Sequence, residues 1–204
     1  MRVTALSDKS DPEVRFDTFE RLNRGGVALT AQEVRACIFR GEFCDLLAEL
    51  ADDPTFRSLV KLQKNHQEDG TREELILKFF AYLDWADKYD GQVTSFLNKY
   101  MEIQGPVFDI AAGRKLFGEV VTRLRSIQGT KPFVRSNTPV TPQNQLEAVM
   151  VALGKLIRSR KKIAAPPSGW LDDEVLVGYS TKGTNTRKAF EGRNNRAVEL
   201  LSSR

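Results

Sequence analysis

The sequence TREELILKFFAYL, residues 71–83, is the most apolar helical pattern in the chain. Its apolar side chains recur three and four positions apart, as on one face of a helix: Leu75, Ile76, Phe79, Phe80 and Leu83. Thr71 followed by Glu74 matches a capping box, in which a hydroxyl and a carboxylate bind free backbone amides at a helix start. We predict a core helix that begins after Thr71, with the aromatic residues up to Trp85 buried.

Helical patterns continue on both sides of this stretch. Thr30 and Glu33 form another capping box, and Thr141 followed by Pro142 is typical of an N-cap with proline at the first helical position. The other predicted helices cover residues 11–22, 30–39, 43–50, 92–103, 109–127, 141–157 and 172–177, with a last helix from Thr186. These patterns predict an all-α fold of about seven to nine helices in a single domain over residues 1–204.

One short stretch departs from the helical pattern. Residues 2–6, RVTAL, alternate in the manner of a β-strand, and no second strand pattern follows. A lone strand cannot satisfy its own backbone groups. We therefore interpret residues 1–6 either as an orphan strand that pairs with something outside this chain or as an irregular segment.

The composition is that of an ordinary globular protein. The 204 residues are 41% hydrophobic and 28% charged, which argues against wholesale disorder. Cys37 and Cys44 form neither a disulfide framework nor a zinc-ligand pair. Because the sequence lacks a secretory signal pattern and any run of 18 apolar residues, we expect a cytoplasmic protein with no membrane partner.

Positive charge is concentrated near the C-terminus. Residues 155–204 hold 11 Lys and Arg against 5 Asp and Glu, whereas residues 1–154 hold 20 against 22. This basic region can attract a phosphate-rich partner, or it can be a solvated surface whose cations complement the dipole of a helix C-terminus. The candidate nucleic-acid contacts are its clustered cations: Arg158, Arg160, Lys161, Lys162, Arg187, Lys188, Arg193 and Arg196.

Common catalytic and metal motifs are missing from the sequence. No Gly-Lys-Ser/Thr signature is present, which excludes a P-loop, and His66 is the only histidine, which excludes a multi-histidine metal site. Cys37 is predicted to be a small core residue, and Trp170 is predicted to be partly exposed. We therefore predict no catalytic residue and no metal site in this chain.

A family resemblance rests on residues 10–47, SDPEVRFDTFERLNRGGVALTAQEVRACIFRGEFCDLL. This run resembles the C-terminal half of domain-of-unknown-function family 262, which includes the GmrS-type subunit of modification-dependent restriction systems. The family pattern Phe-x-x-x-Asn-x-x-Gly-x-x-Leu-x-x-x-Glu is met by Phe19, Asn23, Gly26, Leu29 and Glu33. Weaker likeness continues to residues 181–190, so the resemblance covers nearly the whole chain but only half of the family domain.

The resemblance implies a second half that this sequence does not contain. Family members begin with a region similar to the ParB-type nuclease fold, which carries an Asp-Gly-Gln-Gln-Arg signature, and residues 2–6 would be the last strand of that sheet. An HNH nuclease domain often follows, and it too is missing here. By carry-over, the residues lining a pocket that faces the missing half would be Arg21, Asn23, Gly25, Gly26, Glu33 and Arg35.

Three functional hypotheses follow. The chain is a nucleic-acid-binding or partner-docking half of a restriction-like phage-defence protein, with DNA as its partner and no activity alone. Alternatively, it is one subunit of a split nucleotide hydrolase or nuclease, completed by a protein chain that carries the ParB-like half or an HNH nuclease. The third hypothesis is an inactive structural remnant. No cofactor is expected in this chain, and a nucleoside triphosphate is expected only with the missing half.

Overall fold

The computed structural model describes Val14, Phe16, Thr18 and residues 29–202 of the chain. This part is all-α, as predicted, and contains no β-strand, although an isolated bridge joins Ile163 and Ser202. Its α-helices are α2 (Ala31–Ile38), α3 (Glu42–Ala51), α4 (Pro54–Leu59), α5 (Thr71–Asp84), α6 (Val93–Gln104), α7 (Ile110–Gln128), α8 (Gln143–Arg158), α9 (Glu174–Thr181) and α10 (Arg187–Leu201). The predicted strand at residues 1–6 lies outside the described residues.

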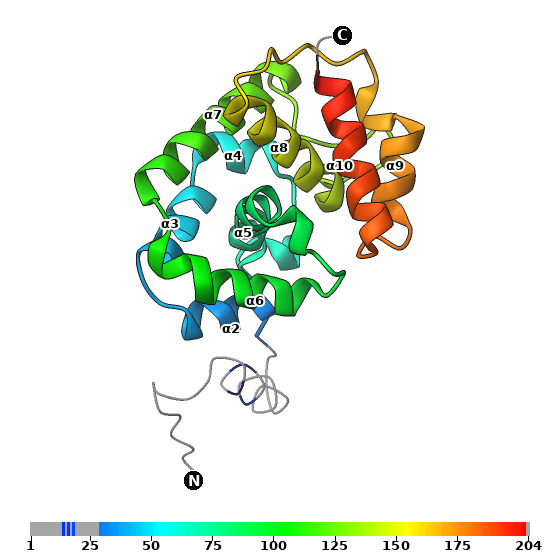
Figure 1. The fold of residues 1–204 in the computed structure, drawn as a ribbon. Helices are drawn as coiled ribbons and strands as arrows, with labels where there is room; N and C mark the ends of the chain where they lie inside the picture. Colours follow the sequence, from blue (N-terminus) through cyan, green and yellow to red (C-terminus); the bar gives the residue numbers. More distant parts are fainter. Residues whose placement is uncertain (1–13, 15, 17, 19–28, 203–204) are drawn as a thin grey trace.

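Helices α5 and α8 form the centre of the fold. Figure 1 shows α5 end-on near the middle, with α3, α6 and α8 around it. Every residue of α8 from Gln145 to Gly154 is buried, because α5, α7 and α10 all pack against this helix. The core helix predicted at residues 71–83 is confirmed as α5.

Aromatic rings fill the space between α3, α5 and α6. Phe80 lies 4.9 Å from Phe79 and 6.1 Å from Phe43 between ring centroids, and Trp85 lies edge-on to Tyr100 at 5.2 Å. Edge-to-face pairs of this kind add to the free energy gained by burying the rings. The prediction that these aromatic residues belong to the core is correct.

Two sequence predictions about side-chain exposure are wrong. Trp170 is only 7% exposed, because its ring packs edge-on against Phe133 at 5.9 Å. Cys37 is an exposed free thiol rather than a core residue, since α2 turns Val34 and Ile38 inward instead.

Helix capping agrees with the sequence at some helices and not at others. Thr30, Asp109 and Thr186 cap α2, α7 and α10 through their side chains. Thr71 does not cap α5, because Gly70 occupies the N-cap in a left-handed conformation with φ of 79°. Thr141 does not cap α8 either; its hydroxyl accepts a hydrogen bond from the Lys61 backbone amide at 2.9 Å and ties two loops together.

The described helices are either short or rich in charge. None of them has the length and apolar character needed to cross a membrane.

Candidate functional site

Most of the pocket predicted from the family resemblance falls outside the described residues. This holds for Arg21, Asn23, Gly25 and Gly26. Glu33 lies within the described residues, where its carboxylate accepts a hydrogen bond from the Thr30 backbone amide at 2.6 Å. Glu33 therefore completes a capping box and is directed at its own helix start rather than at a ligand.

Arg35 does not line a pocket, contrary to the prediction, because its side chain is 1% exposed. Its guanidinium donates to Gln32 Oε1 at 2.9 Å, to Asn98 Oδ1 at 3.4 Å and to the Glu74 carboxylate. We interpret Arg35 as a structural residue, because each of its three guanidinium nitrogens has found an acceptor inside the protein.

Arg35 begins a buried charge network that joins α2, α5 and α8. The network consists of Arg35, Glu74, Lys78 and Glu147, in which Lys78 Nζ lies 3.0 Å from Glu74 Oε1 and 3.2 Å from Glu147 Oε1. Burial opposes ionisation of Glu74, but Lys78 and Arg35 outweigh it and lower the pKa of this carboxyl. Burial also opposes the charge on Lys78, yet Glu147 and Glu74 raise the pKa of the ammonium. Lys78 is thus the ionic partner of Glu147, although Glu147 Oε1 has no hydrogen bond of good geometry within the described residues.

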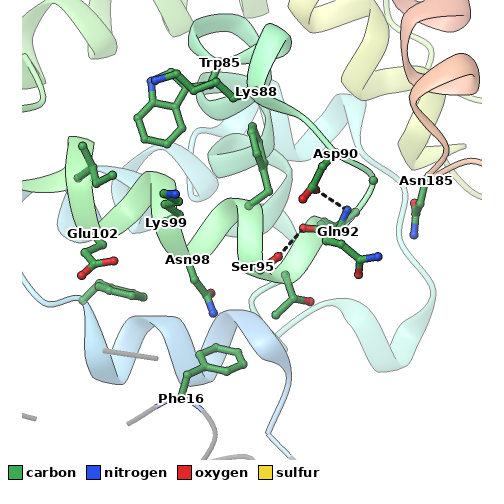
Figure 2. Close-up of a pocket in the computed structure, with 16 residues that line it drawn as sticks. Phe16, Trp85, Lys88, Asp90, Gln92, Ser95, Asn98, Lys99, Glu102 and Asn185 are labelled. Atoms are coloured by element: carbon green, nitrogen blue, oxygen red, sulfur yellow. Dashed lines mark hydrogen bonds between the residues drawn. The ribbon is translucent and has the colours of Figure 1, made fainter. Parts of the chain in front are cut away.

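A cleft of about 1140 Å³ lies next to the network, along α6 (Figure 2). This α6 cleft is lined by Phe16 and Phe39, by side chains within residues 85–103, and by Asn185. Figure 2 shows Asn98 on the side of α6 that faces Phe16. Since Asn98 also accepts from Arg35, the network reaches the cleft wall through this amide.

The α6 cleft has no net charge of its own. Lys88 and Lys99 are matched in number by Asp90 and Glu102. Lys88 Nζ also lies 3.9 Å from the centroid of the Trp85 ring, a cation–π contact. The cleft is therefore a mixed polar and aromatic surface without a preference for anions.

Of the eight basic candidates for nucleic-acid contact, Arg193 is contradicted by the structure. Its side chain is 1% exposed, its guanidinium donates to the Thr184 carbonyl, and it lies over the Phe190 ring at 5.4 Å. Arg193 closes the loop before α10 and does not reach solvent.

Three further candidates are engaged with carboxylates. Arg158 binds Asp84 at 2.6 Å, and Arg187 binds Glu191 at 2.7 Å. Arg196 binds Asp173 at 2.8 Å and also contacts Glu199 at 2.9 Å. A phosphate would have to compete with these acids, so the sequence overstated the positive charge that the C-terminal region offers to a partner.

The remaining candidates are Arg160, Lys161, Lys162 and Lys188, all of them exposed and without a carboxylate partner among the described residues. The first three belong to the basic turn, which we define as residues 158–162, at the C-terminal end of α8. Arg160 has a φ of 52°, and the turn is closed by hydrogen bonds from the Arg160 amide to the Ile157 carbonyl at 3.0 Å and from the Lys161 amide to the Leu156 carbonyl at 2.9 Å. These bonds form a Schellman motif, which fixes the backbone from which the cations project.

A shallow groove of about 640 Å³ runs along α7 beside the basic turn. Ile157 and Ile163, which flank the turn in sequence, both line this α7 groove, together with Lys115, Arg123, Thr122, Ser126, Gly118 and Glu119. Arg123 Nη2 donates to the Ile163 carbonyl at 2.6 Å and holds the segment after the turn against α7. Sequence reasoning missed Lys115 and Arg123. They lie in residues 1–154, where acids elsewhere in the sequence cancel the positive charge of α7 in the total.

Metal ligands do not gather in the part of the chain that the structure describes. No group of three or more His, Cys, Asp and Glu side chains there could hold a metal ion. His66 lies at the surface with Nδ1 2.6 Å from Asp69 Oδ2, an ordinary loop contact. Comparisons with known proteins gave no match: no family model, curated protein or solved structure matches this chain.

Proposed function

We propose that this chain is a nucleic-acid-binding half of a restriction-like defence protein of the family 262 type, and that it holds the sugar-phosphate backbone on the basic turn and the α7 groove. The observation that carries the proposal is the run Arg160, Lys161 and Lys162: three exposed cations in sequence, on a hydrogen-bonded turn, and none of them in an ion pair within the described residues. The family assignment rests on the sequence pattern at Phe19 to Glu33.

The chemistry of this surface suits phosphate rather than base edges. Lysine and arginine bound to phosphates release condensed counterions, and this term is independent of sequence. The groove floor, formed in part by Ile157 and Ile163, offers apolar contact to sugars, and Thr122 presents an exposed hydroxyl on its α7 side. We therefore expect binding that depends strongly on salt and weakly on sequence.

A matched pair of variants tests the proposal. Lys161→Ala with Lys162→Ala removes two charges from the basic turn, whereas Arg57→Ala with Arg114→Ala removes the same net charge from surface arginines that bind Asp52 and Glu49. In a titration of labelled duplex DNA at several salt concentrations, the turn variant should lower the slope of log K against log salt by about 2, because each phosphate contact contributes roughly 0.9. The control variant should keep the wild-type slope.

Two results would contradict the proposal. The wild-type protein could bind neither duplex nor single-stranded DNA at low salt, which removes the nucleic-acid role. Alternatively, the slope of log K against log salt could fall by the same amount in both variants. Binding would then depend on the net charge of the protein and not on the basic turn.

A second candidate function, a subunit of a split nucleotide hydrolase or nuclease, is favoured by the α6 cleft. Phe16 and Phe39 flank the resemblance motif and both line this cleft, and Arg35 of the same stretch reaches it through Asn98. Co-expression with a chain that carries the ParB-like half should then yield a stable complex, and Asn98→Arg, which adds bulk and charge to the cleft wall, should abolish it. A complex that tolerates Asn98→Arg argues against this docking site.

A further inference from the structure

A separate pocket lies between α9 and α10, away from the basic turn. Figure 1 shows the two helices side by side, joined by the short loop before α10. The α9–α10 pocket has a volume of about 440 Å³, within the range of small-ligand sites, and Val175, Gly178, Tyr179 and Ala189 form its apolar part. Val175 is 48% exposed, so the surface is open to solvent.

Tyr179 packs directly against the backbone of α10 because residue 192 is glycine. A Cβ atom at position 192 would lie 2.6 to 2.7 Å from three carbons of the Tyr179 ring, closer than any real contact. The ring therefore rests on helix backbone on the Gly192 side, and it also lines the α9–α10 pocket. A Cβ at Gly178 would meet nothing within 4 Å, so the α9 surface at Gly178, next to Tyr179 in sequence, is open.

Charge is segregated along this pocket. Lys182 and Lys188 lie at the loop end of the pocket. Lys182 is the first residue after α9, Lys188 is in the first turn of α10, and neither has a carboxylate partner among the described residues. Glu174 lies at the other end of α9, roughly 12 Å away by the rise of eight residues. An aromatic ring beside two lysines, with the acid at the far end, matches a planar group that carries a phosphate on one side.

We propose that the α9–α10 pocket binds one unpaired nucleotide of a nucleic acid strand, with its base stacked on Tyr179 and its phosphate beside Lys182 and Lys188. Stacking on an aromatic side chain tolerates every base, and it requires a base that is not stacked in a duplex. This inference rests on the proposed function, and it adds that the preferred partner is single-stranded or locally opened.

The two surfaces lie at opposite ends of α10. The Ala164 amide donates to the Leu201 carbonyl at 2.8 Å, which fixes the segment after the basic turn to the end of α10, whereas Lys188 lies in its first turn. The separation is roughly 20 Å by helix rise, a distance that a strand of several nucleotides can cover.

The test compares Tyr179→Leu, Tyr179→Phe and the Lys161→Ala, Lys162→Ala variant in the full chain. Leucine keeps an apolar contact to Gly192 without a stacking ring, and phenylalanine keeps the ring. The probes are a labelled oligothymidine of about 12 nucleotides and a duplex of the same length, at one fixed salt concentration. Circular dichroism melting confirms that each variant is folded.

We expect Tyr179→Leu to weaken oligothymidine binding by about 10-fold or more, with duplex binding unchanged and Tyr179→Phe like wild type. Photo-crosslinking of an iodouridine-substituted strand should label the peptide that contains Tyr179. If Tyr179→Leu binds oligothymidine as wild type does, or if the crosslink maps elsewhere, the nucleotide site is overturned while duplex binding through the basic turn stands. If wild type binds neither probe, the proposed function fails as well.

Discussion

At the scale of single residues, the charge network around Lys78 brings opposite charges together where water is largely excluded. Glu147 is 2% exposed, and Lys78 Nζ is the cation at 3.2 Å from it. Leaving one member of a buried ion pair without its partner costs more than the pair itself contributes, because the remaining charge has lost water and gained nothing.

Lys78→Met should therefore lower the free energy of unfolding by about 3–5 kcal/mol, measured by urea denaturation at neutral pH. The double variant Lys78→Met with Glu147→Leu should recover most of this loss, since it removes both charges from the core. Arg114→Ala serves as the control, because Arg114 and its partner Glu49 are exposed and should not shift the midpoint. A double variant no more stable than Lys78→Met would show that Glu147 is not the group left uncompensated.

At the scale of elements, α7 contains two glycines in opposite surroundings. A Cβ at Gly113 would lie 2.4 Å from Phe108 Cε1, whereas a Cβ at Gly118 would meet nothing within 4 Å. The Phe108 ring is packed against Phe43 at 4.3 Å between centroids, so it cannot move without disturbing the core. Gly113 is thus required by packing, and Gly118 is not.

The same substitution should have opposite effects at these two positions. Gly113→Ala should destabilise the protein by about 1–3 kcal/mol through overpacking. Gly118→Ala should stabilise it by up to about 1 kcal/mol, because alanine is the better helix former. Thermal unfolding followed by circular dichroism measures both, and a shift of the same sign in the two variants would refute this account of Phe108.

At the scale of the whole molecule, ionisable groups define the pH range of stability. The positive charges of Lys78 and Arg35 lower the pKa of Glu74 despite its burial. The hydrogen-bonded Arg196 lowers the pKa of Asp173. Hydrogen bonds from Thr71 and His66 lower the pKa of Asp69, although burial acts in the opposite direction. In the unfolded chain these groups return to ordinary values of 4.5 for Glu and 3.8 for Asp. The unfolded state therefore takes up protons first as the pH falls.

Stability should accordingly be full above about pH 5 and should decline as the pH falls toward 3. Urea midpoints measured across this range check the prediction. Glu74→Gln should be less stable at neutral pH and should show a shallower decline, because one of the linked carboxylates is gone. An unchanged slope in Glu74→Gln would mean that Glu74 does not contribute to the acid transition.

The alkaline limit follows from buried phenols and from Lys78. Burial raises the pKa of Tyr82 and of Tyr100, the second with help from Asp84, so the unfolded chain loses these protons first above about pH 10. The fold should thus lose stability on the alkaline side as well.

Sequence patterns predicted the helices well and the burial of charged residues poorly. Thr30 and Glu33 cap α2 as expected, because both partners of a capping box lie within one turn. The same reasoning failed at Glu74, whose carboxylate binds Arg35, 39 positions earlier in the chain, and Lys78 instead of its own helix start. The prediction that Arg193 contacts nucleic acid failed for a related reason. A basic residue in a polar helical sequence gave no sign that the Phe190 ring and the Thr184 carbonyl enclose its side chain.

The left-handed backbone of Arg160 sets stability against the proposed phosphate binding at one position. Glycine adopts this conformation without the steric cost that an L-residue incurs, which is on the order of 1 kcal/mol. An Arg160→Gly change would relieve that cost and would also delete a cation from the basic turn. Selection for a more stable chain and selection for tighter binding would therefore favour different residues at position 160.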